Sequence, residues 1–393
     1  MTEALLERVR LRMPLGWRQL RHNPNRLFVA LGGVAFANVL IFLQLGVMGA
    51  LFESAVTPLR TLKADILLMS PDARAIGQLG SMSRRRLYQA LGVDGVAAAS
   101  TLQVGTIEIR SPTSIQQASV MVFGVDPEFD GFTRADISAQ RSLLRTADVA
   151  LLDRLTRSSL RPMVDAITIG GVAKAELQGR TVTLAGLFSL GASFQNDGTM
   201  IVSDQTFLRL FPRNSAAAIN AVLVQTAPGA NVAEVAARLR AALPASDTQV
   251  MTADAYAEFI KDFMRTNTPI GFVFTFGVVI GTLIGFAIVY QILSADVNDH
   301  IREYATFRAM GFHQRYLLGV VFEEALLLAV LGFVPGVVLS LGFNAILSAG
   351  TELAMTMPAM RIAFVFGLTF AMCAASGAIA TRRLKAADPA DVF

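Results

Sequence analysis

The side chains that could carry catalysis or bind metal are few in this sequence, and none is spaced as in the common active-site motifs. The phosphate-binding G-x-x-x-x-G-K-[ST], the dinucleotide-binding G-x-G-x-x-G, the zinc-binding H-E-x-x-H and the nucleophilic G-x-S-x-G do not occur. The candidate groups are His22, His300, His313, Cys373, Glu323 and Glu324. Their spacing supports no metal site. We therefore expect no catalytic, cofactor-binding or metal-binding residues, and we expect that the chain is not an enzyme.

Binding chemistry is more plausible in one polar segment, residues 296–316. Within it Tyr304, Phe307 and Met310 recur three residues apart, which predicts a short helix with one apolar face. Gly311 is placed to end that helix as a C-cap. A short helix with an apolar face suits docking into a groove of a partner protein. The alternative is a solvated hairpin tip.

This segment lies between long apolar stretches that must position it. Hydrophobic residues make up 53% of the chain and charged residues 16%, which is low for a soluble domain. About 20 apolar residues suffice to cross a bilayer as a helix. The predicted membrane spans are 27–52, 269–295, 317–349 and 362–381. The first is too long for the apolar core of a signal peptide. A globular domain, 53–268, separates the first span from the second.

The distribution of Arg and Lys predicts the orientation in the membrane. Basic residues concentrate in segments 1–26, 296–316 and 382–393, whereas the short loop 350–361 has only Arg361. We expect an inner-membrane protein with both termini in the cytoplasm, and with 53–268 and 350–361 outside. The first 26 residues alternate apolar side chains and arginines at helical spacing, which predicts an amphipathic helix on membrane lipids. A contact surface for a cytoplasmic partner is a compatible alternative.

The external segment 53–268 has the pattern of a mixed α and β domain. Residues 104–110 and 119–125 are rich in Val and Ile and predict strands, whereas 83–91 and 232–243 show helical spacing. The stretch 221–250 is typical of strand, helix and strand. We expect two α+β lobes built from the two ends of the segment. The only cysteine, Cys373, lies in the last span, so this domain is expected to contain no disulfide.

A stripe of glycines marks the second span. Gly277, Gly281 and Gly285 recur at four-residue steps and leave one helix face without side chains. Such a face allows another helix to approach closely. The partner helix could belong to the same chain or to a second copy across a two-fold dimer interface.

Several runs of residues resemble a known family. Arg302-Glu303, then residues 308–311 and Glu324-Ala325, are similar to the R-E…A-x-G…E-A pattern of FtsX/MacB-type ABC permeases. Residues 122–127, Val-Phe-Gly-Val-Asp-Pro, resemble a strand and turn of their periplasmic domains. The basic tail ending in Asp388-Pro389-Ala390 also fits. Longer runs resemble the DevC group, the permeases of heterocyst-type DevBCA exporters; they are 51–56, 83–92, 268–272, 288–293, 317–322 and 387–391.

The resemblance extends over most of the chain. It implies a permease with four membrane spans and a MacB-like periplasmic domain. It implies two copies that pair with a cytoplasmic ABC ATPase (DevA-like), which binds the ATP, together with a membrane-fusion protein (DevB-like) and a TolC-like outer-membrane duct. No nucleic-acid partner is expected. The implied work is ATP-driven export of a lipid-like or amphiphilic substrate from the periplasmic side. The residues implied to couple to the ATPase are Arg302, Glu303, Tyr304, Phe307, Arg308, Met310 and Gly311.

One residue departs from the pattern, because Phe307 stands where MacB-type chains often carry a polar or basic residue. A rival reading from another class is an FtsX-like signalling scaffold, which transmits ATPase motion to an external cell-wall hydrolase without transport. Both readings share the cytoplasmic features. The large external segment favours the exporter. A secondary transporter is disfavoured, since ionisable residues at mid-depth and repeated halves are missing from the spans.

Overall fold

The computed structural model describes residues 24–110, 117–191, 193–301, 303, 306, 310, 314–351 and 355–386. It divides into two compact units. The helical unit comprises the described residues of Met1–Gly49, Pro269–Ser348 and Met355–Phe393, and the α/β unit comprises Ala50–Thr268 with the described residues of Ala349–Ala354. Each unit is described below by itself.

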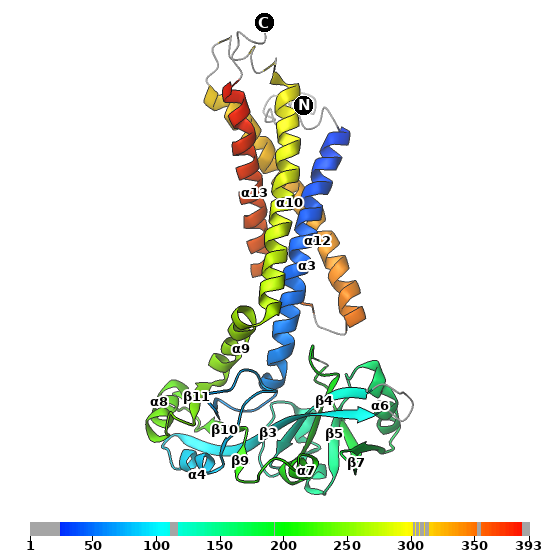
Figure 1. The fold of residues 1–393 in the computed structure, drawn as a ribbon, viewed down its shortest axis with the longest axis vertical. Helices are drawn as coiled ribbons and strands as arrows, with labels where there is room; N and C mark the ends of the chain where they lie inside the picture. The colour runs from blue at the N-terminus through cyan, green and yellow to red at the C-terminus, as the bar shows by residue number, and fades with distance from the viewer. Residues whose placement is uncertain are drawn as a thin grey trace, which may run out of the picture. The chain divides into compact units, whose positions relative to one another are not determined.

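Four long helices build the helical unit (Figure 1). They are α3 (Pro24–Arg60), α10 (Pro269–Asp299), α12 (Gln314–Thr351) and α13 (Ala359–Ala386). Within the described residues, each contains a stretch long and apolar enough to cross a membrane. All four helices extend past the predicted spans, since helical hydrogen bonding continues where the apolar sequence ends. The membrane boundaries themselves stay a prediction.

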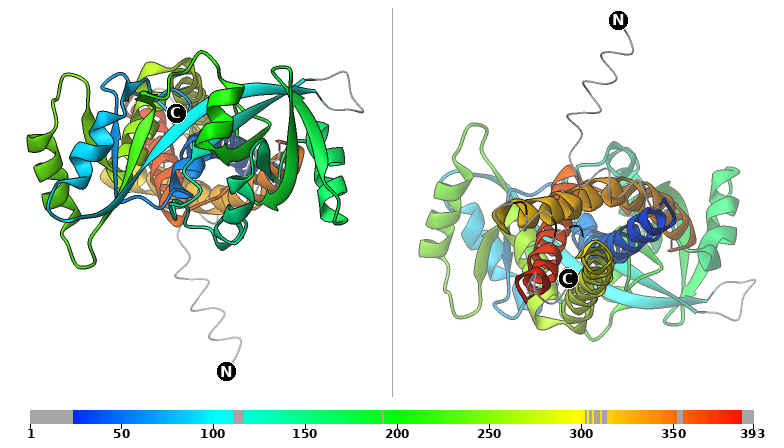
Figure 2. Two further views of the ribbon diagram at one scale, coloured as in Figure 1. Left: turned by 90° about the horizontal axis from the view of Figure 1, so that it is seen from below. Right: turned by 90° about the horizontal axis from the view of Figure 1, so that it is seen from above.

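Small residues bring the four helices together around shared contacts, and Figure 2 views the bundle end on. Buried side chains from all four helices form one apolar cluster that includes Val34, Val289, Ala325 and Cys373. A second cluster centres on Ile41, Phe42 and Val365. Residues 1–23 of the predicted N-terminal amphipathic helix (1–26) lie outside the described residues, and so does the end of the tail, 387–393.

A single nine-stranded sheet forms the centre of the α/β unit, in the order β11-β1-β10-β3-β4-β8-β5-β7-β6. The strands are β1 (Ile66–Met69), β3 (Val96–Arg110), β4 (Gln117–Val125), β5 (Val149–Asp153), β6 (Ala173–Leu177), β7 (Arg180–Phe188), β8 (Gly198–Ser203), β10 (Ala221–Thr226) and β11 (Gln249–Thr252). Most neighbours are antiparallel; β4–β8 and β5–β7 are parallel. A separate two-stranded sheet pairs β2 (Met82–Ser83) with β9 (Ala218–Ile219).

Short helices cover this sheet (Figure 1). They are α4 (Arg85–Leu91), α5 (Ala135–Ser138), α6 (Arg161–Thr168), α7 (Asp204–Leu210), α8 (Val232–Ala242) and α9 (Ala253–Asn267), with 3-10 turns at Arg141–Arg145 and Ser158–Leu160. Asn231 caps α8 by accepting a hydrogen bond from the Ala233 N–H. The predicted strands at 104–110 and 119–125 and the predicted helices at 83–91 and 232–243 are therefore confirmed, with ends shifted by a few residues.

The prediction of one lobe from each end of the external segment is wrong. Both ends contribute to one core, which joins Ile66 and Leu68 of β1 to Val222 and Leu239 from the far end of the segment. The middle of the segment builds the other core, from Ile107 to Leu210. Strand β3 belongs to both, because its 15 residues run from one core to the other. Local pattern could not reveal this, since it depends on which distant strands pair.

Candidate functional site

The predicted binding segment extends from one end of the helical unit, where α10 ends at Asp299 and α12 begins at Gln314. Glu303 is helical and exposed, and the side chain of Met310 is 60% exposed. The Met310 N–H donates to Thr306 O, four residues earlier, over 3.0 Å. The other predicted coupling residues, Arg302, Tyr304, Phe307, Arg308 and Gly311, lie outside the described residues.

Next to this segment, charged side chains from three helices gather in what we call the loop-end cluster: Arg26, Asp296, Asp299, His300 and Glu324. Arg26 Nη1 of α3 lies 2.6 Å from Asp299 Oδ2 and 3.7 Å from Asp296 Oδ1. His300 Nδ1 lies 3.0 Å from Asp296 O and 3.6 Å from Asp296 Oδ1. The cluster therefore ties the end of α3 to the end of α10 through ion pairs.

Glu324 of α12 completes the cluster. Its side chain is only 1% exposed. Asp296 is 5% exposed, and its carboxyl group lies beside that of Glu324. Two carboxyl groups can share a hydrogen bond only when one of them holds a proton. This pair is the most unusual chemistry in the described part of the chain.

One signal in the sequence could have revealed the burial of Glu324. The buried face of α12 includes Val321, Ala325 and Leu328, all fully buried. Glu324 stands three residues after the first and four before the last, so it falls on the same helix face.

The glycine stripe of α10 packs against helices of the same chain. A Cβ at Gly277 would lie 2.5 Å from Gln44 Cδ, and one at Gly281 would lie 3.1 Å from Ile41 Cγ1, both on α3. At Gly285 the Cβ would lie 2.5 Å from Met372 Sδ and 2.7 Å from Ala37 Cβ. The stripe could contact a helix of the same chain or of a second copy. These contacts are with helices of the same chain.

Helix α12 approaches α3 in the same manner. A Cβ at Gly332 would lie 2.7 Å from Val34 Cβ, and one at Gly336 would lie 2.8 Å from Asn38 Cβ. Asn38 is fully buried, and its Oδ1 accepts a hydrogen bond of 2.5 Å from Thr369 Oγ1 on α13. Asn38 of α3 thus contacts both α12 and α13, and these contacts hold α3 in position within the helical unit.

In the α/β unit, buried polar groups serve to shape a loop. The fully buried Asp153 accepts backbone hydrogen bonds from Leu190 N (2.9 Å) and Gly191 N (2.7 Å) and from Leu155 N (3.0 Å). Burial raises the pKa of Asp153, and these N–H donors together with the charge of Arg134 oppose that shift. The carboxylate holds the turn that follows β7.

Asp136 supports the same turn from the other side. Its Oδ2 accepts from Ser189 N over 3.1 Å and from Arg134 Nη2 over 2.9 Å. The hydrogen bond from Arg134 lowers the pKa of Asp136. Among the described residues, no group of three or more His, Cys, Asp or Glu side chains is arranged to bind a metal ion.

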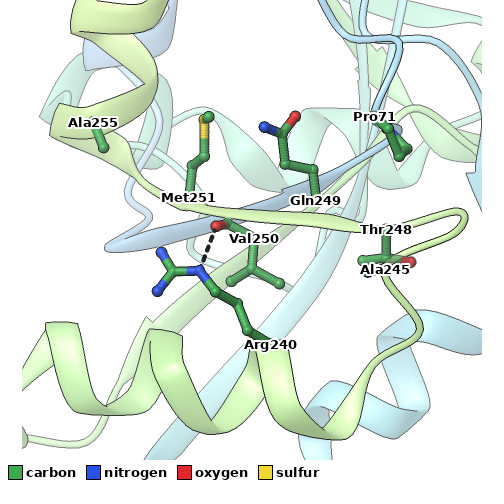
Figure 3. Close-up of a pocket in the computed structure, with 8 residues that line it drawn as sticks. All are labelled: Pro71, Arg240, Ala245, Thr248, Gln249, Val250, Met251 and Ala255. Carbon is green, nitrogen blue, oxygen red and sulfur yellow. Dashed lines mark hydrogen bonds between the residues drawn. The ribbon is translucent and has the colours of Figure 1, made fainter.

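A pocket of about 560 Å³ opens beside the edge strand β11 (Figure 3). Its lining comes from Pro71, Arg240, Ala245, Thr248, Gln249, Val250, Met251 and Ala255. Arg240 Nε donates to Val250 O over 3.2 Å, as the dashed line in Figure 3 marks. That bond occupies a carbonyl of β11. The pocket offers one cation and no carboxylate or histidine among its lining residues.

Comparison with known families decides the class of protein. The profile of the MacB-like periplasmic core domain matches residues 27–242, which is more than half of the chain. The profile of the FtsX-like permease C-terminal domain matches residues 275–389, which include Asp296, Asp299, His300 and Glu324 of the loop-end cluster. The chain belongs to the FtsX/MacB family of ABC-type permeases. It is thus a membrane subunit of the kind that works with an ABC ATPase.

Two solved structures are similar to the α/β portion of this permease. The extracellular domain of the noncanonic ABC-type transporter YknZ from Gram-positive bacteria has 16% identity and a TM-score of 0.32, and the match covers 48% of this chain and 98% of that one. The periplasmic region of MacB from Actinobacillus actinomycetemcomitans has 12% identity and a TM-score of 0.33, with 51% and 94% covered. A search of curated sequences finds no match.

Proposed function

We propose that this permease is the transmembrane subunit of a DevC-type tripartite exporter, in which a separate cytoplasmic ATPase drives extrusion of a lipid-like or amphiphilic substrate from the periplasmic side. The observation that carries the proposal is the FtsX-like match over 275–389, which includes the whole segment 296–316, all of α12 and most of α10. A partner that moves this segment would move α10 and α12 directly, because the segment joins them.

The α/β unit is proposed to transmit that movement outside the membrane. Helix α9 of this unit runs to Asn267, and α10 begins two residues later at Pro269. Lys261 Nζ of α9 lies 3.4 Å from Glu53 Oε2 on α3, and Glu53 also pairs with Arg60. The ion pair between Lys261 and Glu53 joins α9 to α3, the two helices through which the chain leaves and enters the unit. We propose two copies per complex, with a DevB-like fusion protein and a TolC-like duct as the external partners.

Replacement of Phe307 by Ala tests the coupling role. If Phe307 is an anchor at the centre of the ATPase interface, its loss costs about 2 kcal/mol or more. That corresponds to roughly a thirtyfold weaker affinity. We expect the variant to lose the ATPase in pull-down and to lose substrate export at equal abundance in the membrane.

The matched control is Phe194→Ala, which removes an aromatic ring that is 53% exposed in the α/β unit. It should leave ATPase binding at the wild-type level. Wild-type binding and export by Phe307→Ala would mean that 296–316 is not the coupling element. Normal ATPase binding and ATP turnover by a complex that exports nothing would instead favour the signalling scaffold.

Orientation is tested separately with cysteine labelling in a Cys373→Ala background. Ile169, which is 87% exposed in the α/β unit, and the exposed Glu303 are each replaced by Cys. An impermeant maleimide applied to spheroplasts should label the Ile169→Cys chain and not the Glu303→Cys chain. The reverse pattern would contradict the proposed topology.

A further inference from the structure

The loop-end cluster contains more negative groups than its cations can neutralise at close range. Arg26 makes its closest ion pair with Asp299, at 2.6 Å, and stands 3.7 Å from Asp296. Glu324 lies against Asp296 and is the most deeply buried of the three carboxyl groups. Two ionised carboxylates in contact and out of water would be strongly destabilising.

The hydrogen bonding of Asp296 and Glu324 also indicates that the two carboxyl groups are not both ionised. Asp296 Oδ2 and Glu324 Oε2 are both buried and find no N–H or O–H donor anywhere in the described part of the chain. A buried acceptor without a donor costs the full desolvation penalty of that oxygen. A proton held between the two carboxyl groups would remove that penalty, since one group then donates and the other accepts.

Titratable or charged side chains near Asp296 and Glu324 come from all four helices of the helical unit. Arg26 belongs to α3, Asp299 is the last residue of α10 and His300 follows it, and all three act electrostatically on Asp296. Glu323 precedes Glu324 on α12 and is half-buried. On α13, up to Ala380, the titratable side chain in the adjoining apolar cluster is the thiol of Cys373. Among these groups, Arg26 is the permanent cation.

We propose that Asp296 and Glu324 form a site for a single shared proton, which holds the end of α10 to α12 next to the segment that joins them. The ligand of the site is H⁺, and binding it forms one O–H···O bond between the two helices. Release of the proton leaves two adjacent negative charges, which repel one another and weaken the contact. Separation of the end of α10 from α12 and occupancy of the site by a proton are therefore coupled.

Infrared spectroscopy of the purified full-length chain, without any partner, tests the site directly. A protonated carboxylic acid has a C=O stretching band distinct from that of carboxylates, and the band shifts in D₂O. We expect the wild-type protein to show this band at neutral pH. Glu324→Gln and Asp296→Asn should each abolish it, because the remaining carboxyl group then ionises beside Arg26.

The matched control is Glu323→Gln, which changes the neighbouring carboxyl group and should keep the band. Absence of the band from the folded wild-type protein would overturn the proposal. A band that survives both substitutions would also overturn it, and so would one lost in only one of them, since the proton would then belong to a single residue. Size-exclusion profiles and circular dichroism establish that each variant is folded before the spectra are compared.

Thermal unfolding in detergent provides a second readout. The folded state binds one proton more than the unfolded chain, so the wild-type midpoint should fall as the pH rises through the release of that proton. Glu324→Gln cannot release it, so this variant should lack that fall. A wild-type midpoint with no more dependence on alkaline pH than that of Glu324→Gln would contradict the proposal. Since no ATPase is present, either result is independent of the proposed export function.

Discussion

Both units of this permease bury carboxyl groups, and they solve the problem in opposite ways. In the α/β unit, Asp153 is surrounded by three backbone N–H donors and shapes a turn. In the helical unit, Asp296 and Glu324 turn toward each other, with Arg26 alongside. A sheet with irregular loops has free backbone donors to offer, whereas the N–H groups of a long helix are already used within it. A buried carboxyl group between helices must therefore find side chains or a proton.

The two units also differ in what holds them together, and removal of a core aromatic should have the largest effect. Phe207 is fully buried, stacks on Phe211, and covers Gly124. Phe207→Ala should lower the free energy of unfolding of the α/β unit by about 3–5 kcal/mol, because it leaves a cavity. Pulse proteolysis in urea measures this. Phe194→Ala, on the surface, should change the value by no more than about 0.5 kcal/mol. Equal effects would mean that this core does not stabilise the unit.

In the helical unit, the corresponding test of packing adds a methyl group where two helices lie close together. Gly285→Ala places a methyl group against Met372 and Ala37, and overpacking of this kind costs about 1–3 kcal/mol. Gly367→Ala is the control, because its Cβ would have no neighbour within 4 Å. It should be neutral or stabilising by up to about 1 kcal/mol, the helix propensity gained. Unfolding in mixed detergent compares the two. Destabilisation by both, or by neither, would contradict the close packing of α3, α10 and α13.

The contrast between the carboxyl groups predicts different responses to amide replacement. Asp153→Asn should destabilise the α/β unit by about 1–3 kcal/mol, since the amide NH₂ in place of Oδ2 would meet the Gly191 N–H and leave it without an acceptor. Glu324→Gln should be nearly neutral at neutral pH, because the amide can donate to Asp296 as the shared proton does. Urea unfolding and detergent unfolding, respectively, provide the two values. Similar losses for both variants would remove the distinction between the two kinds of site.

The smallest effect concerns Arg134 and Asp136, which are partly exposed. Arg134 lowers the pKa of Asp136 below its ordinary 3.8, so the pair stabilises the folded state above that range. The contribution is lost as the pH falls from about 3.8 through the lower folded value. Arg134→Gln should cost about 0.2–1 kcal/mol at neutral pH and less in acid. Arg213→Gln, at an exposed arginine, is the control for the loss of one charge. A loss of unfolding free energy by Arg134→Gln that is larger in acid than at neutral pH would contradict the prediction.

Much of the helical unit could be predicted from the sequence, because a run of apolar residues identifies a long helix without reference to any other part of the chain. The α/β unit was predictable only in part. Residues 221–250 form strand, helix and strand as their spacing indicates, since Asn231 and the turn before it mark the start of α8. The nine-stranded order was not predictable, because β10 pairs with β3 across more than a hundred residues.

The candidate site illustrates the same limit at the level of single residues. Glu324 lies on the buried face of α12 by its spacing, yet its partner Asp296 and its neighbour Arg26 come from two other helices. Their meeting depends on how α3, α10 and α12 pack, which local periodicity does not encode. The glycine stripe was visible in the sequence, whereas the identity of the helix it contacts was not.

The path of the chain through the α/β unit has a consequence for how such a domain can change in evolution. The chain leaves the first core along β3 and returns to it at β10, and these two strands are hydrogen-bonded neighbours. The second core is therefore a nested insertion whose entry and exit lie side by side. Its loops and helices can be lengthened, shortened or exchanged for another module while β1, β10 and β11 keep their register. Related permeases could thus diversify one half of the domain and leave unchanged the half through which the chain enters and leaves.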